Sequence, residues 1–249
     1  MSLASEYQRQ FAWRDWPTAF GALPTLAGQV VLDLGCGIGD QAAELVARGA
    51  RVIGVDANEA LLDEARARRL PNTEFRRGDL RALDLDVTAD GLWSSFTAAY
   101  FPDFTPVLQC WKEHLRPGGW IALTEVNDLF AHEPLTDRTR SLLETFARDA
   151  SAASRYDFHM GGKLQAHLGQ AGFLVSKALS VADRELSFAG AADPGVIDAW
   201  RARFDRMQLL REFCGPEFEH AREEFLACLA RADHSCRARV CICLATAPA

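Results

Sequence analysis

The sequence predicts an α/β fold in which helices cover both faces of a doubly wound, mostly parallel β-sheet. Short apolar runs typical of buried strands alternate with segments whose apolar residues recur at helical spacing. A glycine-rich loop joins the first of these runs to the first helical segment. Strands that alternate with helices form parallel sheets with right-handed crossovers, and both faces of such a sheet are buried.

Glycine and acidic residues mark where the predicted strands end. The first strand, residues 30–34, runs directly into Gly35, and the second, residues 51–55, ends at Asp56. Asn58 can cap the helix that follows, because its side chain can accept a backbone N–H of the first turn. Further strands are expected at residues 73–76, 91–96, 120–126, 173–180 and 237–245, and helices at residues 41–48, 58–69, 107–115 and 163–171.

Two long helical segments, residues 134–150 and 194–231, interrupt this alternation after the fifth strand. The chain contains no repeat, low-complexity tract or long linker that would divide it into parts. We therefore expect one domain, residues 1–249, that carries two helical cap insertions, residues 128–160 and residues 183–234.

Composition and charge exclude several classes of function. Lys and Arg total 27 against 34 Asp and Glu, a formal charge of −7, so no nucleic-acid partner is expected. No apolar run approaches the roughly 18 residues of a membrane span, and the N-terminus lacks the apolar core of a signal peptide. The seven cysteines form no C-x-x-C pair, which predicts reduced thiols in a cytoplasmic protein and no zinc site.

The glycine-rich loop indicates a ligand that contains adenosine. Gly35, Gly37 and Gly39 allow a tight turn and a close approach of the backbone to a ligand. Asp56 follows Gly35 by 21 positions, at the end of the next strand, where a carboxylate can accept both hydroxyls of a ribose. Together these features predict a ligand that lies across the carboxyl ends of the first two strands.

Charge distinguishes between two ligands of this kind. Dinucleotide-binding loops have their last glycine where this chain has Asp40, and a carboxylate there would repel a pyrophosphate. S-adenosylmethionine has no phosphate; it has a sulfonium and an ammonium group. Asp33 could hold that ammonium directly or through water. The loop therefore favours S-adenosylmethionine over NAD.

In four segments the chain resembles the class I S-adenosylmethionine-dependent methyltransferases: LDLGCGIG at 32–39, GVD at 54–56, GDL at 78–80 and LRPGG at 115–119. The resemblance implies a seven-stranded sheet whose last strand is antiparallel, a methyltransferase activity, and S-adenosylmethionine as cofactor. It also implies that Asp56 binds the ribose and that Asp79, with the amide of Leu80, reads the adenine. Two alternatives stay open, because Asp79 could only shape a turn and Asp56 could only cap a helix. The expected cofactor-binding residues are Asp33, Gly35, Gly37, Gly39, Asp56, Ala57, Asp79, Leu80, Ser95 and Phe96.

The residues that would handle the methyl acceptor carry a weaker signal. Methyl transfer from a sulfonium requires no fixed catalytic residue, because the protein mainly positions the nucleophile and excludes water. His159 is the preferred general base, although a lone histidine is more often structural. Residues 1–27 are expected to form a helical lid, with an amphipathic helix packed on the sheet as the alternative, and Arg201, Arg203 and Arg206 a solvated helix face. The expected acceptor-binding residues are Tyr7, Phe11, Trp13, Tyr100 and Tyr156.

We therefore expect a cytoplasmic methyltransferase that acts on an oxygen or nitrogen of a small, aromatic or apolar metabolite of a secondary pathway. A closed, aromatic-lined pocket favours such an acceptor over a macromolecule. Three alternatives stay open: a methyltransferase for tRNA or a protein, a nicotinamide-dependent oxidoreductase, and a non-catalytic cofactor-binding module. No catalytic metal and no membrane partner are expected, and a homodimer is left open.

Overall fold

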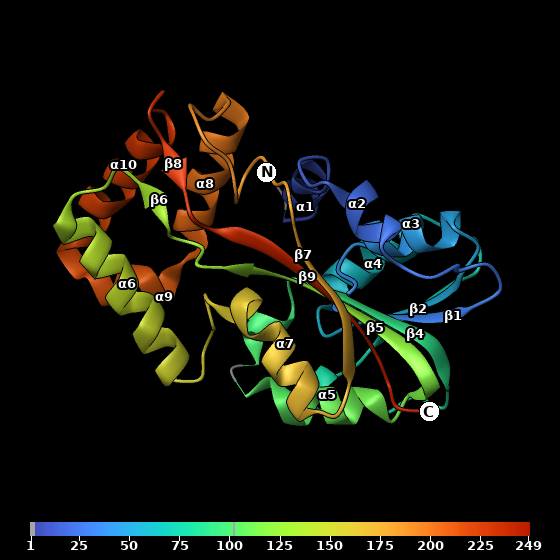
Figure 1. The fold of residues 1–249 in the computed structure, drawn as a ribbon. Helices are drawn as coiled ribbons and strands as arrows, with labels where there is room; N and C mark the ends of the chain where they lie inside the picture. Colours follow the sequence, from blue (N-terminus) through green and yellow to red (C-terminus); the bar gives the residue numbers. More distant parts are fainter. Residues whose placement is uncertain (1–2, 102) are drawn as a thin grey trace.

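One seven-stranded sheet organises the computed structural model, which describes residues 3–101 and 103–249 (Figure 1). Within this part of the chain the strand order is β3-β2-β1-β4-β5-β9-β7, and β9 is antiparallel to both of its neighbours. The prediction of a mostly parallel sheet with an antiparallel last strand is confirmed. The strands are β1 (Val30–Leu34), β2 (Arg51–Asp56), β3 (Thr73–Arg77), β4 (Ala89–Ser95), β5 (Leu115–Asn127), β7 (Leu174–Val181) and β9 (Arg239–Thr246).

Helices cover both faces of the sheet, as Figure 1 shows. On β1, Val31 packs into the core beneath α2 (Trp16–Gly21) and α3 (Asp40–Ala47), whereas Leu32 faces the other core, beneath α5 (Phe104–Lys112) and α7 (Met160–Gln170). This alternation follows from the period of two along a strand. Two further helices, α1 (Leu3–Phe11) and α4 (Glu59–Ala67), lie on the same side as α3.

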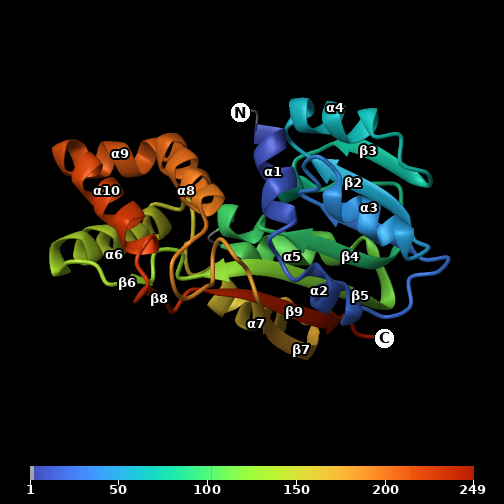
Figure 2. The ribbon, with the colours of Figure 1, turned by 90° about the horizontal axis from the view of Figure 1, so that it is seen from above.

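A helical cap lies beyond the carboxyl end of β5 (Figure 2). It consists of α6 (Asp137–Ala152), α8 (Pro194–Arg206), α9 (Gln208–Cys214), α10 (Phe218–Leu229) and a two-stranded sheet of β6 (His132–Glu133) and β8 (Ser235–Cys236). Aromatic rings form its core; the centroids of Trp200 and Phe225, for example, lie 4.8 Å apart. The first part of the cap follows β5, and the second part lies between β7 and β9. These strands of the main sheet hold the cap beside the carboxyl end of β5.

Two details differ from the sequence prediction. The segment expected as one helical insertion, residues 194–231, is divided into α8, α9 and α10, because Met207 leaves the helical conformation and Gly215 has a φ of 53°. Strand β5 begins at Leu115, before the predicted turn, and its register against β4 shifts between Ala89 and Gly91. Residues 116–119, which the sequence predicts as a turn, therefore lie in an irregular stretch between β4 and β5.

Candidate functional site

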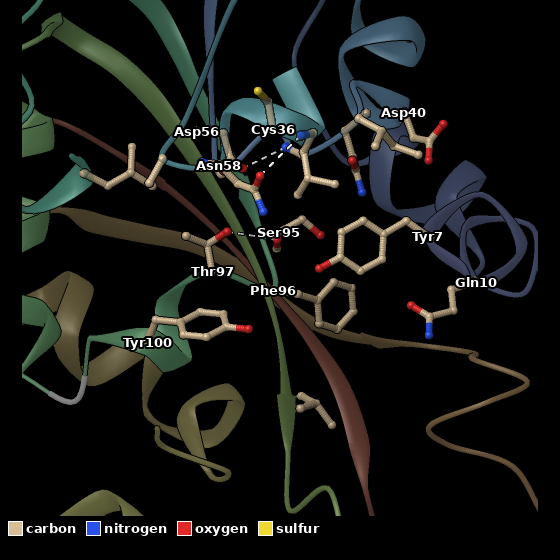
Figure 3. A pocket seen from close by; sticks show the side chains of 18 of the residues that line it. Tyr7, Gln10, Cys36, Asp40, Asp56, Asn58, Ser95, Phe96, Thr97 and Tyr100 are labelled. Carbon is tan, nitrogen blue, oxygen red and sulfur yellow. Dashed lines mark hydrogen bonds between the residues drawn. The ribbon is translucent and has the colours of Figure 1, made fainter. Parts of the chain in front are cut away.

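A cavity of about 580 Å³ opens at the carboxyl ends of β1, β2 and β4 (Figure 3). The loop that follows β1 and the residues that follow β2 line one half of it, and α1 and α8 contribute residues to the other half. In doubly wound sheets, ligands bind at this edge, where neighbouring strands send their connections to opposite faces. The size lies within the range of small-molecule sites.

The three glycines of the loop adopt conformations that other residues rarely reach. Gly35, Gly37 and Gly39 have φ angles of 79°, 52° and 77°. A Cβ on Gly35 would lie 2.1 Å from Oγ1 of Thr97. The loop can therefore pack against the residues that follow β4 only because Gly35 has no side chain. Gly35 and Gly37 line the cavity, whereas Gly39 lies outside its lining, at the N-cap position of α3.

Asp56 connects this loop to the end of β2. Its carboxylate accepts the backbone N–H of Gly37 at 2.9 Å and that of Asn58 at 2.8 Å, and it lines the cavity together with Ala57. The helix-capping alternative does not describe Asp56, because Asn58 is the residue that caps α4, through Ala60 and Leu61. Two oxygens with four acceptor directions leave the carboxylate free to accept further hydrogen bonds from a ligand.

Asp33 lies beneath the loop and not in the cavity. Asp33 is only 2% exposed and is not part of the lining. Its Oδ2 atom has no hydrogen-bond partner. Burial, followed by the charge of Asp56, raises the pKa of Asp33 to about 8. A direct contact between Asp33 and a ligand ammonium is therefore not supported, and a contact through water stays a prediction.

Residues after β3 and β4 complete the half of the cavity that contains the glycine loop. Asp79 and Leu80 line it, and Asp79 also accepts the N–H of Arg81 at 2.9 Å, so the turn interpretation of Asp79 is compatible with the site. Ser95 lines the cavity with a buried hydroxyl that has no partner. Phe96 follows with a left-handed φ of 54°, a strained conformation of the kind found at functional sites.

Tyrosine side chains gather mainly in the other half, although the ring of Tyr7 also lies against the glycine loop. The chain has three tyrosines, Tyr7, Tyr100 and Tyr156, and all three line this cavity together with Phe11. Tyr7 and Tyr100 point their hydroxyls into it from opposite sides (Figure 3), and the rings of Tyr100 and Tyr156 meet edge to face at 5.0 Å. Burial raises the pKa of each of the three phenols, which therefore stay protonated at neutral pH.

Two arginines, Arg14 and Arg203, also line this half, and sequence reasoning missed both of them. Arg203 was expected on a solvated face, but its guanidinium donates to the fully buried Glu185 at 2.6 Å. Arg14 pairs with the buried Asp183 at 2.8 Å and lies 4.4 Å from the ring centroid of Phe96. No local motif marks either arginine, because their carboxylate partners come from a distant segment after β7.

Comparison with known proteins agrees with this geometry. A family model described as a methyltransferase domain matches residues 31–119. A trans-aconitate 2-methyltransferase of Methylobacterium nodulans is 31% identical over 232 residues, which cover 90% of this chain and 85% of that protein. The chain belongs to the class I S-adenosylmethionine-dependent methyltransferases. Its matches to the trans-aconitate 2-methyltransferases of Deinococcus radiodurans and Azoarcus are shorter and span 45% and 37% of those proteins.

Solved structures share the fold of this methyltransferase. An S-adenosylmethionine-dependent methyltransferase of Mesorhizobium loti superimposes with a TM-score of 0.55 at 22% identity, covering 92% of this chain and 97% of that one. A phosphoethanolamine N-methyltransferase of Haemonchus contortus, solved with S-adenosylmethionine, has a TM-score of 0.57 at 19% identity and covers 98% of this chain and 53% of that one. At these identities the likeness shows the fold alone.

The residues of this methyltransferase fit its family's cofactor. A glycine loop without room for a Cβ at Gly35, the remaining acceptor capacity of Asp56, and the unpartnered hydroxyl of Ser95 all face one half of the cavity. Asp56 and Asp79 place carboxylates in this half, which suits a ligand that carries a sulfonium and no phosphate; Asp40 also lines it but is paired with Arg68.

Besides Asp33 and Gly39, two more of the predicted site residues lie away from the cavity of this methyltransferase. Trp13 is not part of its lining. His159 lines a separate hollow of about 30 Å³, where its Nδ1 lies 3.9 Å from Oδ1 of Asp128. The chain turns between Tyr156, which faces the cavity, and His159, which lies at the N-cap position of α7. The prediction that His159 acts as a general base therefore lacks the required geometry.

In residues 3–101 and 103–249 no helix is both long and apolar enough to cross a membrane. The same part of the chain contains no group of three or more His, Cys, Asp or Glu side chains arranged to hold a metal ion.

Proposed function

We propose that this methyltransferase transfers the methyl group of S-adenosylmethionine to an oxygen or nitrogen of a small molecule. The observation that carries the proposal is the cavity itself, in which the glycine loop and Asp56 form one half and side chains from α1 and α8 form the other. The half formed by α1 and α8, where the methyl acceptor would bind, is thus covered by the protein, which favours a small acceptor over a macromolecule.

Residues of this chain would divide the work as follows. Asp56 would hold the ribose hydroxyls, Asp79 and the Leu80 amide would read the adenine, and Ser95 and Phe96 would lie along the cofactor. When bound, S-adenosylmethionine supplies an electrophilic methyl group, so the protein's main tasks are orientation and exclusion of water. Tyr7 of α1 would close the cavity over the loop, because it lies 3.8 Å from the position of a Cβ on Gly37.

We propose a corresponding division of the chain within one domain. Residues 1–27, which contain α1 and α2, would act as a lid, and residues 128–160 and 183–234 would form the cap. Arg14, Tyr156 and Arg203 support this proposal, because each comes from one of these three segments and all line the cavity. We also propose that the protein works in the cytoplasm.

The acceptor we propose is more polar than the sequence alone suggested. Arg14 and Arg203 line the cavity, each paired with a buried carboxylate, so polar groups as well as aromatic rings would face the acceptor. The related proteins named trans-aconitate 2-methyltransferase make small carboxylic acids the first compounds to test.

Two measurements test the proposed function. Titration of the purified protein with S-adenosylhomocysteine and, separately, with NADH should give binding of the first alone. Transfer of a labelled methyl group should then reach a small molecule in a panel of acids, amines and phenols. Binding of NADH alone, or label that enters only peptide or RNA, would reject the proposal. A peptide product deserves inclusion because a cypemycin N-terminal methyltransferase of a Streptomyces species is 35% identical over 129 residues.

A further inference from the structure

Two tyrosines of the cavity belong to segments that are far apart in the sequence and meet at one hydrogen bond. Tyr100 ends the short 3₁₀-helix η2 (Ala98–Tyr100) after β4, and Tyr156 precedes α7. The carbonyl of Ala99 accepts the N–H of Asp157 at 2.8 Å. Each tyrosine is therefore next in sequence to one partner of this bond, and their rings meet edge to face at 5.0 Å.

Glu125 of β5 holds the other side of Ala99. Its Oε1 atom accepts the N–H of Ala99 at 3.2 Å, and its Oε2 atom accepts the N–H of Val126 at 2.9 Å. Glu125 is fully buried and does not line the cavity, whereas Val126, the next residue on the strand, does. Successive side chains of a strand point to opposite faces of the sheet, so the two residues face different sides. The carboxylate of Glu125 thus supports the tyrosine segments without reaching a ligand itself.

The start of α7 packs directly on β5, and this contact anchors the segment that carries Tyr156. A Cβ on Gly161 would lie 2.9 Å from the carbonyl oxygen of Glu125, so the helix approaches the strand only because this residue has no side chain. Asp157 is buried and pairs with Lys163 of α7. With this segment anchored, hydrogen bonds to it and to β5 hold η2 in place.

Ionisation of Glu125 changes these hydrogen bonds. A carboxylate accepts both N–H groups, whereas a protonated carboxyl presents an O–H to one of them. Burial raises the pKa of Glu125 to about 7, against the hydrogen bonds from Val126 and Ala99, which lower it. The geometry in which both oxygens accept an N–H is that of the ionised form.

Other titratable and charged groups surround this carboxyl on several elements: Asp157 before α7, Arg14 after α1, Cys241 of β9, and the phenols of Tyr100 and Tyr156. Burial raises the pKa of the thiol and of both phenols, so all three stay protonated at neutral pH. Asp157 pairs with Lys163, and Arg14 pairs with Asp183. Of these groups, Glu125 is therefore the one whose charge changes near pH 7.

We infer, resting on the proposed function, that Glu125 is a positioning residue for the methyl acceptor, because its carboxylate sets Tyr100 and Tyr156 through the backbone of Ala99. Methyl transfer depends on the distance and angle between the acceptor atom and the methyl carbon, so a small displacement of the side chains around the acceptor lowers the rate. The ionised form of Glu125 holds the two tyrosines in the arrangement described above, and the protonated form loosens it.

Carbon-13 spectra of the tyrosines test the positioning without an acceptor. The chain has three tyrosines, so protein labelled at the ring carbon that bears the hydroxyl gives three signals, which single Tyr→Phe variants assign. Between about pH 5.5 and 8.5 we expect the signals of Tyr100 and Tyr156 to move together in one transition near pH 7. Tyr7 is the internal control, because Arg206 and Asp56 are the charges that act on it most.

Glu125→Gln removes the titration and leaves an amide whose oxygen can accept only one of the two N–H groups reliably. We expect the Tyr100 and Tyr156 signals of this variant to be constant with pH and to differ from those of the wild type above pH 7. Binding of S-adenosylhomocysteine should stay within about threefold of the wild type. Glu113→Gln, the same exchange at an exposed position that ends α5, is the matched control. The wild-type titration needs no variant, so it tests the inference even if Glu125→Gln does not fold.

Turnover gives a second readout, with the compound of the acid, amine and phenol panel that takes up the most label. Its kcat/KM should be lower in Glu125→Gln than in the wild type by about twofold at pH 6 and by about tenfold at pH 8. The ratio widens because the wild-type carboxyl is mostly protonated at the lower pH and mostly ionised at the higher one. A general structural defect would lower kcat/KM by the same factor at both.

The outcomes separate the inference from the proposed function. Signals of Tyr100 and Tyr156 that stay constant with pH in the wild type, or that move equally in Glu125→Gln, would overturn the inference while the proposed function stands. A ratio of kcat/KM that is the same at both pH values would overturn it as well. A wild-type protein that binds no S-adenosylhomocysteine and methylates no compound in the panel would reject the proposed function, and the inference with it.

Discussion

Asp56 serves the site twice at the scale of single residues. One part of its carboxylate holds the loop through the N–H of Gly37, at 2.9 Å, and the rest faces the cavity. The position of Asp56 beside the loop could be predicted because the loop, the end of β2 and the start of α4 are close in sequence; its contact with a ribose stays a prediction.

Replacing Asp56 therefore gives the first prediction. Asp56→Ala should weaken S-adenosylhomocysteine binding by about 1.5–3 kcal/mol, because charge-assisted hydrogen bonds are lost, and Asp56→Asn should cost less. Calorimetric titration measures both. Asp63→Ala on α4, where Asp63 pairs with Arg66 at the surface, is the control. A dissociation constant that is the same in Asp56→Ala and the wild type would show that the ribose is held elsewhere.

His159 gives the opposite prediction. Because it lines the small hollow beside Asp128 and not the main cavity, His159→Ala should retain turnover within about tenfold of the wild type. A lost general base would instead cost roughly 10²–10⁴-fold. Steady-state rates with saturating methyl donor decide between the two, and a loss of the larger size would restore His159 to catalysis.

Arg203 shows why part of the site escapes sequence reasoning. On α8 it is one of three arginines at similar spacing, and nothing local separates it from Arg201, which pairs with Asp198 at the surface. The difference is made by Glu185, a fully buried carboxylate that reaches Arg203 only in the folded protein. Long-range pairs of this kind leave no periodicity or motif to find.

At the scale of elements, α1 is held to the cap by polar contacts. Glu6 pairs with Arg206 of α8, and Gln10 donates to Glu185 at 3.3 Å. These contacts join the proposed lid directly to the part of the chain that supplies Arg203. An element whose attachment depends on a few polar contacts opens more easily than the core of the sheet.

Weakening this attachment should loosen α1 without disturbing the sheet. Glu6→Gln removes the charge that faces Arg206, so we expect faster amide exchange in Leu3–Phe11 and unchanged exchange in β1 and β4. Glu219→Gln, which breaks surface pairs of the cap, serves as the control. Unaltered protection of α1 in Glu6→Gln would mean that apolar packing alone holds the helix.

The elements themselves were predictable to different degrees. Strands β1 and β2, whose interior residues are buried, read as apolar runs and fall close to their predicted ranges, whereas β5 begins before its predicted range. The breaks between α8, α9 and α10 could not be predicted, because apolar residues recur at helical spacing on both sides of Met207 and Gly215. The two-residue strands β6 and β8 are too short for any pattern to mark.

At the scale of the whole molecule, a buried carboxyl couples stability to pH. Glu125 on β5 is 0% exposed and accepts the N–H groups of Ala99 and Val126, at 3.2 and 2.9 Å. Burial raises the pKa of Glu125 from 4.5 to about 7. The folded protein therefore binds this proton more tightly than the unfolded chain, and the resulting stabilisation is complete below pH 4.5 and lost as the pH rises to 7.

Glu125→Gln should remove this dependence. The free energy of unfolding of the wild type should fall relative to the variant by about 3 kcal/mol between pH 4.5 and 7.5, with no further relative change above that range. Urea unfolding at several pH values measures the difference, and comparison of the two proteins cancels the titration of Asp33. A difference that stays constant with pH would mean that folding does not raise the pKa of Glu125.

The position of β9 has a consequence for how the chain is made. β7 joins the sheet only through β9, and the whole of α8, α9 and α10 is synthesised between these two strands. While a ribosome produces that stretch, β5 presents an open edge, the kind of surface on which nascent chains associate wrongly. We expect translation stalled before Arg239 to yield a polypeptide that proteases cut at β7, and chaperones that shield strand edges to matter most during this interval.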